Sequence, residues 1–157
     1  MMENNKEITP LSQEFDFSKV PSWYVLCTNS ECPLRANCLR YLAGTNAPDN
    51  MELARCVMPK MLKNGECRWF DQITVGVWAA GFSHLFDKVL KKDYTVMRLA
   101  ITTYLHGTRI YYEYKRGERV LSPAEQQWIR DYVRSLGYDW EVEFDKYFED
   151  YIYHQKA

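Results

Sequence analysis

Apolar residues recur at helical spacing in the second half of the chain. Between residues 75 and 91, apolar positions follow one another at intervals of three and four, which places them on one face of a helix. The same spacing continues over residues 95–104, with Asp93 or Thr95 as the candidate cap and Gly107 as the stop. This pattern predicts two amphipathic helices, over 75–91 and 95–104.

The clearest local signal is a helix start at Ser122. Ser122 suits the N-cap, Pro123 suits the first helical position, and Glu125 stands where it completes a capping box. Apolar residues then recur as far as Leu136, and Gly137 closes the segment. The sequence therefore predicts a helix between these two points.

The remaining elements are shorter. Residues 110–114 are compatible with a strand or with the continuation of a helix, because periodicity alone does not separate the two. Residues 145–153 predict a short aromatic helix near the C-terminus, and residues 34–42 predict another short helix. Residues 23–26 favour an extended conformation.

These elements predict a mainly α protein, with an α+β fold as the alternative. We expect an N-terminal arm over 1–20, a cysteine-rich metal-binding subdomain over 21–70, and a body of three or four helices over 71–157. The middle region is dominated by loops and turn residues, and it packs on the helical body. Because such a region has little apolar surface of its own, it needs a covalent or metal staple.

Five cysteines lie within 41 residues of that middle region, and the rest of the chain has none. Their spacing is C-x4-C-x5-C-x17-C-x10-C, at Cys27, Cys32, Cys38, Cys56 and Cys67. Four thiolates suit a structural zinc site, although no C-x2-C pair is present. Irregular intervals also suit an iron–sulfur cluster. The third interpretation is no metal, with thiols that pack in the interior or form disulfides.

Four of these cysteines are the expected metal ligands. Cys27, Cys32 and Cys38 form a compact triplet, and Cys67 follows a tight turn that presents its thiolate. Cys56 lies among apolar residues and is the least expected ligand, although it and Cys67 are able to exchange roles. The cofactor is either zinc or an iron–sulfur cluster.

A second candidate surface interleaves tyrosines with cations. Residues 55–136 carry a net charge of +6, whereas residues 1–54 carry −3 and residues 137–157 carry −4. Aromatic rings that stack on bases and cations that neutralise phosphate are typical of nucleic-acid surfaces. The alternative is ordinary packing of the rings, with the cations reaching solvent. The candidate nucleic-acid or partner contacts are Arg109, Tyr111, Tyr112, Lys115, Arg116 and Arg119.

No catalytic motif is visible in the sequence. It has no H-E-x-x-H helix, no Ser/His/Asp order and no glycine-rich phosphate loop, so we expect a protein that is not an enzyme. The N-terminus lacks the pattern of a signal peptide, and the longest apolar stretch is too short to span a bilayer. These features predict a cytoplasmic protein without membrane contact. The oligomeric state is left open.

Three motifs resemble those of a small uncharacterised cysteine-containing family of Bacteroidetes, a domain of unknown function. They are E-C-P-L-R-A-N-C-L-R-Y at residues 31–41, G-E-C at residues 65–67, and the tyrosine-rich segment at residues 111–117. The resemblance covers most of the chain and implies no activity. It supports treating the cysteine block and the C-terminal helices as one unit.

Taken together, the patterns predict a non-enzymatic metal-binding module of the cytoplasm. It is expected to act by binding a nucleic acid or a protein partner, with the metal holding its loops in place. The alternative is an iron–sulfur redox or sensor protein, in which oxidation of the cluster alters the adjacent helices.

Overall fold

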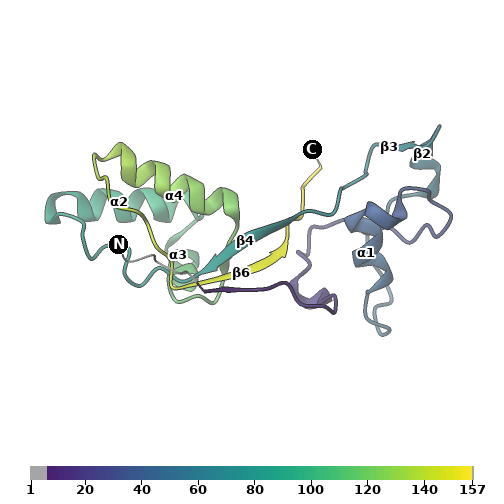
Figure 1. The fold of residues 1–157 in the computed structure, drawn as a ribbon, viewed down its shortest axis with the longest axis horizontal. Helices are drawn as coiled ribbons and strands as arrows, with labels where there is room; N and C mark the ends of the chain where they lie inside the picture. The colour runs from purple at the N-terminus through teal and green to yellow at the C-terminus, as the bar shows by residue number, and fades with distance from the viewer. Residues whose placement is uncertain (1–6, 157) are drawn as a thin grey trace. The chain divides into compact units, whose positions relative to one another are not determined.

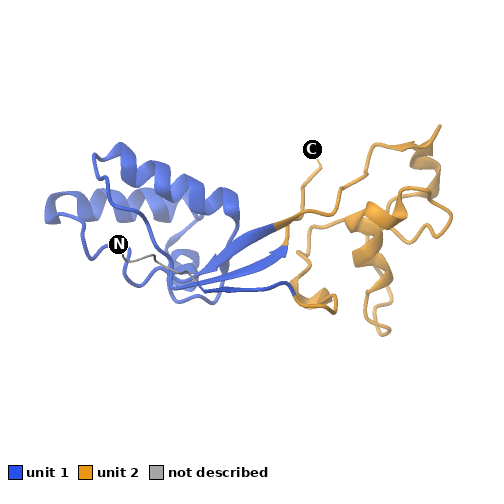
Figure 2. Ribbon diagram, viewed as in Figure 1, with its two compact units in different colours: residues 1–11, 76–150 blue, residues 12–75, 151–157 orange. Residues whose placement is uncertain are grey.

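The computed structural model describes residues 7–156, which form two compact units (Figures 1 and 2). Unit 1 comprises the described part of residues 1–11 together with residues 76–150. Unit 2 comprises residues 12–75 and the described part of residues 151–157. Each unit has a hydrophobic core of its own, and neither is continuous in sequence.

Unit 1 combines a four-stranded mixed sheet with three helices. The strand order is β1-β6-β4-β5, with β1 parallel to β6 and β4 antiparallel to β5. Figure 1 shows α2 and α4 side by side. The strands are β1 (Ile8–Thr9), β4 (Val75–Ala80), β5 (Val120–Leu121) and β6 (Lys146–Tyr151), and the helices are α2 (Lys91–Tyr104), α3 (Thr108–Lys115) and α4 (Pro123–Ser135).

Aromatic stacking and one buried amide join the helices and the sheet of unit 1. Tyr104 on α2 stacks on Trp128 of α4, with ring centroids 3.9 Å apart and planes nearly parallel. The side chain of Gln126 is buried and donates to the carbonyls of Val77 and Leu121, at 2.9 and 3.1 Å. This amide ties α4 to two strands at once.

The fold is α+β, so the prediction of a mainly α protein is wrong. Two segments predicted as helices contain strands. The first begins with β4, whose valines and tryptophan suit a pleated surface. There Trp78 donates its indole N–H to the carbonyl of Asp150, and Gly81 at φ +79° then ends the regular backbone. The second contains β6, which pairs with β1 in the register Ile8 to Tyr147.

Other predicted elements are confirmed. The capping box is present, with the Ser122 hydroxyl accepting from the Glu125 N–H and the Glu125 carboxylate accepting from the Ser122 N–H. Helix α2 includes the predicted 95–104 segment but begins at Lys91, with Leu90 rather than Asp93 or Thr95 at the N-cap. The ambiguous 110–114 segment is helical, because it lies within α3.

Unit 2 has little regular structure and a small core. Its core cluster contains four buried apolar residues, whereas that of unit 1 contains thirteen. The predicted 34–42 helix divides into a 3-10 turn (Arg35–Asn37) and α1 (Leu39–Thr45). Residues 23–26 contribute one isolated bridge, and the first six residues of the predicted N-terminal arm lie outside the described residues. The other elements are 3-10 turns at Phe17–Lys19 and Pro59–Met61, and a hairpin of β2 (Leu62–Lys63) and β3 (Glu66–Cys67).

Helix α1 lies directly against the backbone of Cys27. A Cβ atom added at Gly44 would stand 2.1 Å from the Cys27 carbonyl oxygen and 2.9 Å from its carbonyl carbon. Only glycine permits this approach, since backbone atoms cannot move aside as a flexible side chain does. The position of Cys27 therefore depends on a residue without a side chain in α1.

We predict that Gly44→Ala lowers the free energy of unfolding by about 2 kcal/mol or more, the upper part of the range for overpacking. The measurement is urea unfolding followed by circular dichroism. Thr45→Ala is the matched control, since Thr45 is exposed in the same helix and its hydroxyl donates only to carbonyls of that helix. Equal stability of the two variants would contradict the close contact.

Candidate metal centre

Four of the five cysteines line one small cavity in unit 2. They are Cys27, Cys32, Cys38 and Cys67, and the cavity has a volume of about 20 Å³. Cys56 is exposed and does not line it. The four cysteines are the ones expected as ligands from the sequence, and the outlying one is the cysteine expected to be left over. The other lining residues are Leu34, Arg35, Arg40, Tyr41, Val57, Trp69 and Phe70.

Turns and short elements position the four thiols. The Cys27 N–H donates to the Arg40 carbonyl, and the Cys32 N–H donates to the Asn29 carbonyl in a turn. Cys38 is buried at the N-cap of α1, and its carbonyl accepts a hydrogen bond from the N–H of Leu42. Cys67 lies on β3, after a tight turn with positive φ at both central residues. Each thiol is therefore anchored through its own backbone.

The other three thiols of the cavity influence the pKa of Cys27. Burial raises the pKa of the Cys27 thiol, and the neighbouring Cys38, Cys32 and Cys67 raise it further. A hydrogen bond from the Asn29 backbone opposes this change. A bound cation would reverse the balance, because a metal favours the deprotonated thiolates that ligate it.

The four thiols line the same cavity, but their sulfurs do not have the arrangement of a metal site. Within residues 7–156, no group of three or more His, Cys, Asp or Glu side chains has the arrangement of a metal site. Rotation about the Cα–Cβ bond moves a sulfur between staggered positions and leaves the backbone in place. Metal ligation by these four cysteines thus stays a prediction.

A buried arginine forms one wall of the cavity. Arg40 is 3% exposed and lies over the rings of Tyr24 and Trp69, at 4.6 and 5.3 Å from their centroids. Its guanidinium donates to three backbone carbonyls, those of Trp69 (2.7 Å), Val25 (2.8 Å) and His154 (3.3 Å). No carboxylate of the described residues forms an ion pair with it. Its charge therefore favours negative charge in the cavity.

A buried carboxylate lies on the other side of Tyr24. Asp71 accepts from the Tyr24 hydroxyl at 2.6 Å, and its second oxygen lies 2.8 Å from the His154 ring. Burial, the Asp71 hydrogen bond and the Asp71 charge hold the pKa of Tyr24 well above its usual range. Sequence reasoning missed Tyr24, Arg40, Asp71 and His154. No spacing signal reveals them, since the contacts join positions 47 to 114 residues apart.

The cationic, tyrosine-rich segment has mostly internal partners. Tyr111 is 1% exposed and belongs to the core of unit 1, so its ring does not face a partner. Arg109 and Arg119 both pair with Glu113, and Arg116 pairs with Glu118. Tyr112 is the exposed tyrosine of the expected set, and Lys115 is half-buried. A role of this segment in binding nucleic acid or another partner stays a prediction.

The same segment contains a tyrosine that makes unit 1 sensitive to high pH. Burial, together with the charge of Glu125 and a hydrogen bond to it, raises the pKa of Tyr114 to about 12. An unfolded tyrosine ionises near pH 10. The neutral hydroxyl therefore contributes its full stability below about pH 10, and this contribution is lost as the pH rises toward about 12.

We predict that the free energy of unfolding falls between about pH 10 and pH 12, and that Tyr114→Phe makes the fall shallower. Urea unfolding at pH steps across this range measures it. Tyr112→Phe, an exposed position on the same helix, is the control. Identical slopes in wild type and Tyr114→Phe would disprove the coupling.

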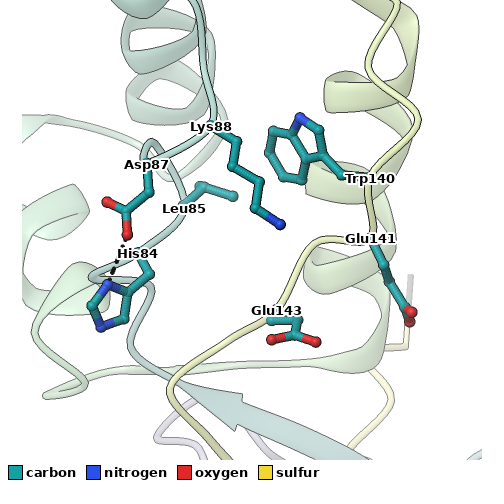
Figure 3. Close-up of a pocket in the computed structure, with 7 residues that line it drawn as sticks. All are labelled: His84, Leu85, Asp87, Lys88, Trp140, Glu141 and Glu143. Atoms are coloured by element: carbon teal, nitrogen blue, oxygen red, sulfur yellow. Dashed lines mark hydrogen bonds and ion pairs between the residues drawn. The ribbon is translucent and has the colours of Figure 1, made fainter. Parts of the chain in front are cut away.

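Unit 1 has a larger cavity of mixed charge, shown in Figure 3. Its volume is about 350 Å³, and the His84 ring lies 2.9 Å from the Asp87 carboxylate at its edge. Lys88 and the carboxylates of Glu141 and Glu143 extend around the same space. Cations and anions are mixed in this lining, which also includes Leu85 and Trp140, so it selects no single ligand charge.

The described residues define an α+β protein with a four-cysteine cavity in its second unit. The chain belongs to a family of unknown function (DUF6078), whose model matches residues 4–153. No curated protein and no solved structure matches it. Membership of a family of unknown function is therefore confirmed, whereas the Bacteroidetes origin stays a prediction. Among the described residues, no helix is long and apolar enough to cross a membrane.

Proposed function

We propose that this protein is a non-enzymatic binding module of the cytoplasm in which one Zn²⁺ ion holds unit 2 together. The ligands are Cys27, Cys32, Cys38 and Cys67, and the ion has a structural role. The observation that carries the proposal is the convergence of these four thiols on one cavity. All five cysteines are free, which fits a reducing compartment.

The small core of unit 2 explains why an ion is needed there. Four buried apolar residues support a unit made mostly of loops and turns. Ordering each loop residue costs about 1–2 kcal/mol of conformational entropy, which so small a core does not offset. A tetrahedral zinc site supplies folding free energy directly, since the preformed site does not exist in the unfolded chain.

The size of the cavity favours a single ion over an iron–sulfur cluster. A volume of about 20 Å³ is close to the space of one water-sized sphere. A cluster with several iron and sulfide atoms would need the cavity walls to move apart. The charge also fits, because four thiolates around Zn²⁺ leave a net negative charge beside Arg40. The iron–sulfur redox or sensor function is therefore the alternative outcome of the metal test.

We predict one zinc per chain and no visible colour when the protein is purified anaerobically without chelator. Elemental analysis and the absorption spectrum measure this directly. Brown protein that contains iron and acid-labile sulfide would show that the cofactor is an iron–sulfur cluster and not zinc. Protein that contains no metal and has five titratable thiols would rule out both the zinc ion and the iron–sulfur cluster.

Single Cys→Ser variants separate ligands from the spare thiol. We predict that Cys27→Ser, Cys32→Ser, Cys38→Ser and Cys67→Ser each weaken zinc binding by more than about 100-fold, the upper limit for changes outside the ligand shell. Cys56→Ser is the matched control and keeps one zinc with unchanged affinity, because Cys56 does not line the cavity. Competition with a chromogenic chelator gives the affinities. Loss of zinc in Cys56→Ser with retention in Cys67→Ser would show that Cys56 is the fourth ligand and Cys67 the spare thiol.

A further inference from the structure

A second cavity of unit 2 gathers positive charge and tryptophan rings. Its volume is about 160 Å³. Three cations line it, whereas no Asp or Glu is among its described lining residues. The lining residues are Trp23, Val25, Arg40, Arg55, Trp69, His154, Gln155 and Lys156.

The cations of this pocket favour a negatively charged ligand. Arg40 is buried, and its three hydrogen bonds all go to carbonyl oxygens, whose dipoles offset part of its charge without adding a negative charge. A charge removed from water is stable only where an opposite charge or strong dipoles offset it. Arg55 and Lys156 add two exposed cations around the same space. The nearby carboxylate, Asp71, is engaged by Tyr24 and His154.

The tryptophans specify a planar, aromatic ligand. Trp23 is 40% exposed, and Trp69 is half-buried with Arg40 placed over its ring at 5.3 Å. Aromatic rings with cations beside them bind nucleobases by stacking and phosphates by charge. The cavity is of the size of one planar base and is too small for a bulky ligand.

We infer that this pocket binds a nucleoside phosphate, either free or as one nucleotide of a single strand. The base stacks on a tryptophan ring and the phosphate pairs with Arg55 and Lys156, while Arg40 supplies charge from the wall. The inference rests on the proposed function in one respect, because Arg40 and Trp69 line the cysteine cavity as well. It assigns nucleotide binding to unit 2 and not to the cationic segment of α3.

The test is isothermal titration of the zinc-loaded full chain with AMP, adenosine, inorganic phosphate and an oligomer of ten thymidylates. We expect AMP to bind at least about 10-fold more tightly than adenosine or phosphate, because only AMP engages both the rings and the cations. An oligomer that binds more than about 10-fold more tightly than AMP identifies a single strand as the ligand, and equal affinity identifies a free nucleotide. Phosphate binding as tight as that of AMP, or no binding of AMP and oligomer, would overturn the inference.

Variants locate the binding in this pocket. Trp23→Ala should weaken AMP binding by about 10-fold, and Arg55→Ala with Lys156→Ala should weaken it and flatten its salt dependence. The matched control is Lys60→Ala with Lys63→Ala, which removes two exposed cations of unit 2 that do not line the pocket. An equal loss in the control would show non-specific attraction and overturn the inference.

Zinc content, measured on every sample, separates the two proposals. Loss of AMP binding in Trp23→Ala with one zinc per chain retained assigns the effect to the pocket. AMP binding by protein that contains no metal would leave this inference standing and remove the zinc proposal. Zinc-loaded wild-type protein that binds neither AMP nor the oligomer would overturn this inference and leave the zinc proposal standing.

Discussion

The guanidinium of Arg40 connects three separate stretches of unit 2. It bonds to the carbonyl of Val25 before the cysteine segment, to that of Trp69 after it, and to that of His154 near the C-terminus. Three stretches of chain that share almost no regular secondary structure are thereby held at one point. Hydrogen bonds from a charged donor are stronger than those between neutral groups, which suits a unit with so few buried apolar residues. Removing this side chain would also leave three partly buried carbonyls without their Arg40 donor.

The same charge explains why the two cavities of unit 2 have different characters. On one side Arg40 faces thiols, which become anions when they ligate a metal. On the other side it contributes to a pocket whose cations are arranged around tryptophan rings. One buried cation thus favours negative charge in both directions. The aromatic rings of Tyr24 and Trp69 lie against it, and no carboxylate within residues 7–156 forms an ion pair with it.

Local signals in the sequence predict local structure well. The capping box at Ser122 is confirmed because every group that forms it lies within four residues. The helix predicted over 75–91 is wrong because its apolar spacing also fits a strand that is followed by turns. The strand ends at Ala80, and Gly81 follows it with a left-handed backbone. Strand β6 depends on pairing with a segment at the opposite end of the chain, which no local pattern encodes.

The candidate site shows the same division. Four cysteines could be grouped from their spacing, since short intervals keep three of them near one another and a turn presents the fourth. Arg40 and Asp71 could not be found in this way. Their importance comes from burial and from partners far away in sequence, and an arginine or an aspartate in a turn-rich segment looks like an ordinary solvent-exposed residue.

The interleaved path of the chain has a consequence for biosynthesis. Unit 2 draws on residues 12–75 and then on residues 151–156, with the whole of residues 76–150 in between. On the ribosome, the cysteine segment emerges long before the carbonyl of His154 that completes the Arg40 bonds. The cysteines are therefore translated before most of unit 1 and before the residues that complete unit 2. An ion captured early would protect the nascent thiols from oxidation while the rest of unit 1 is translated.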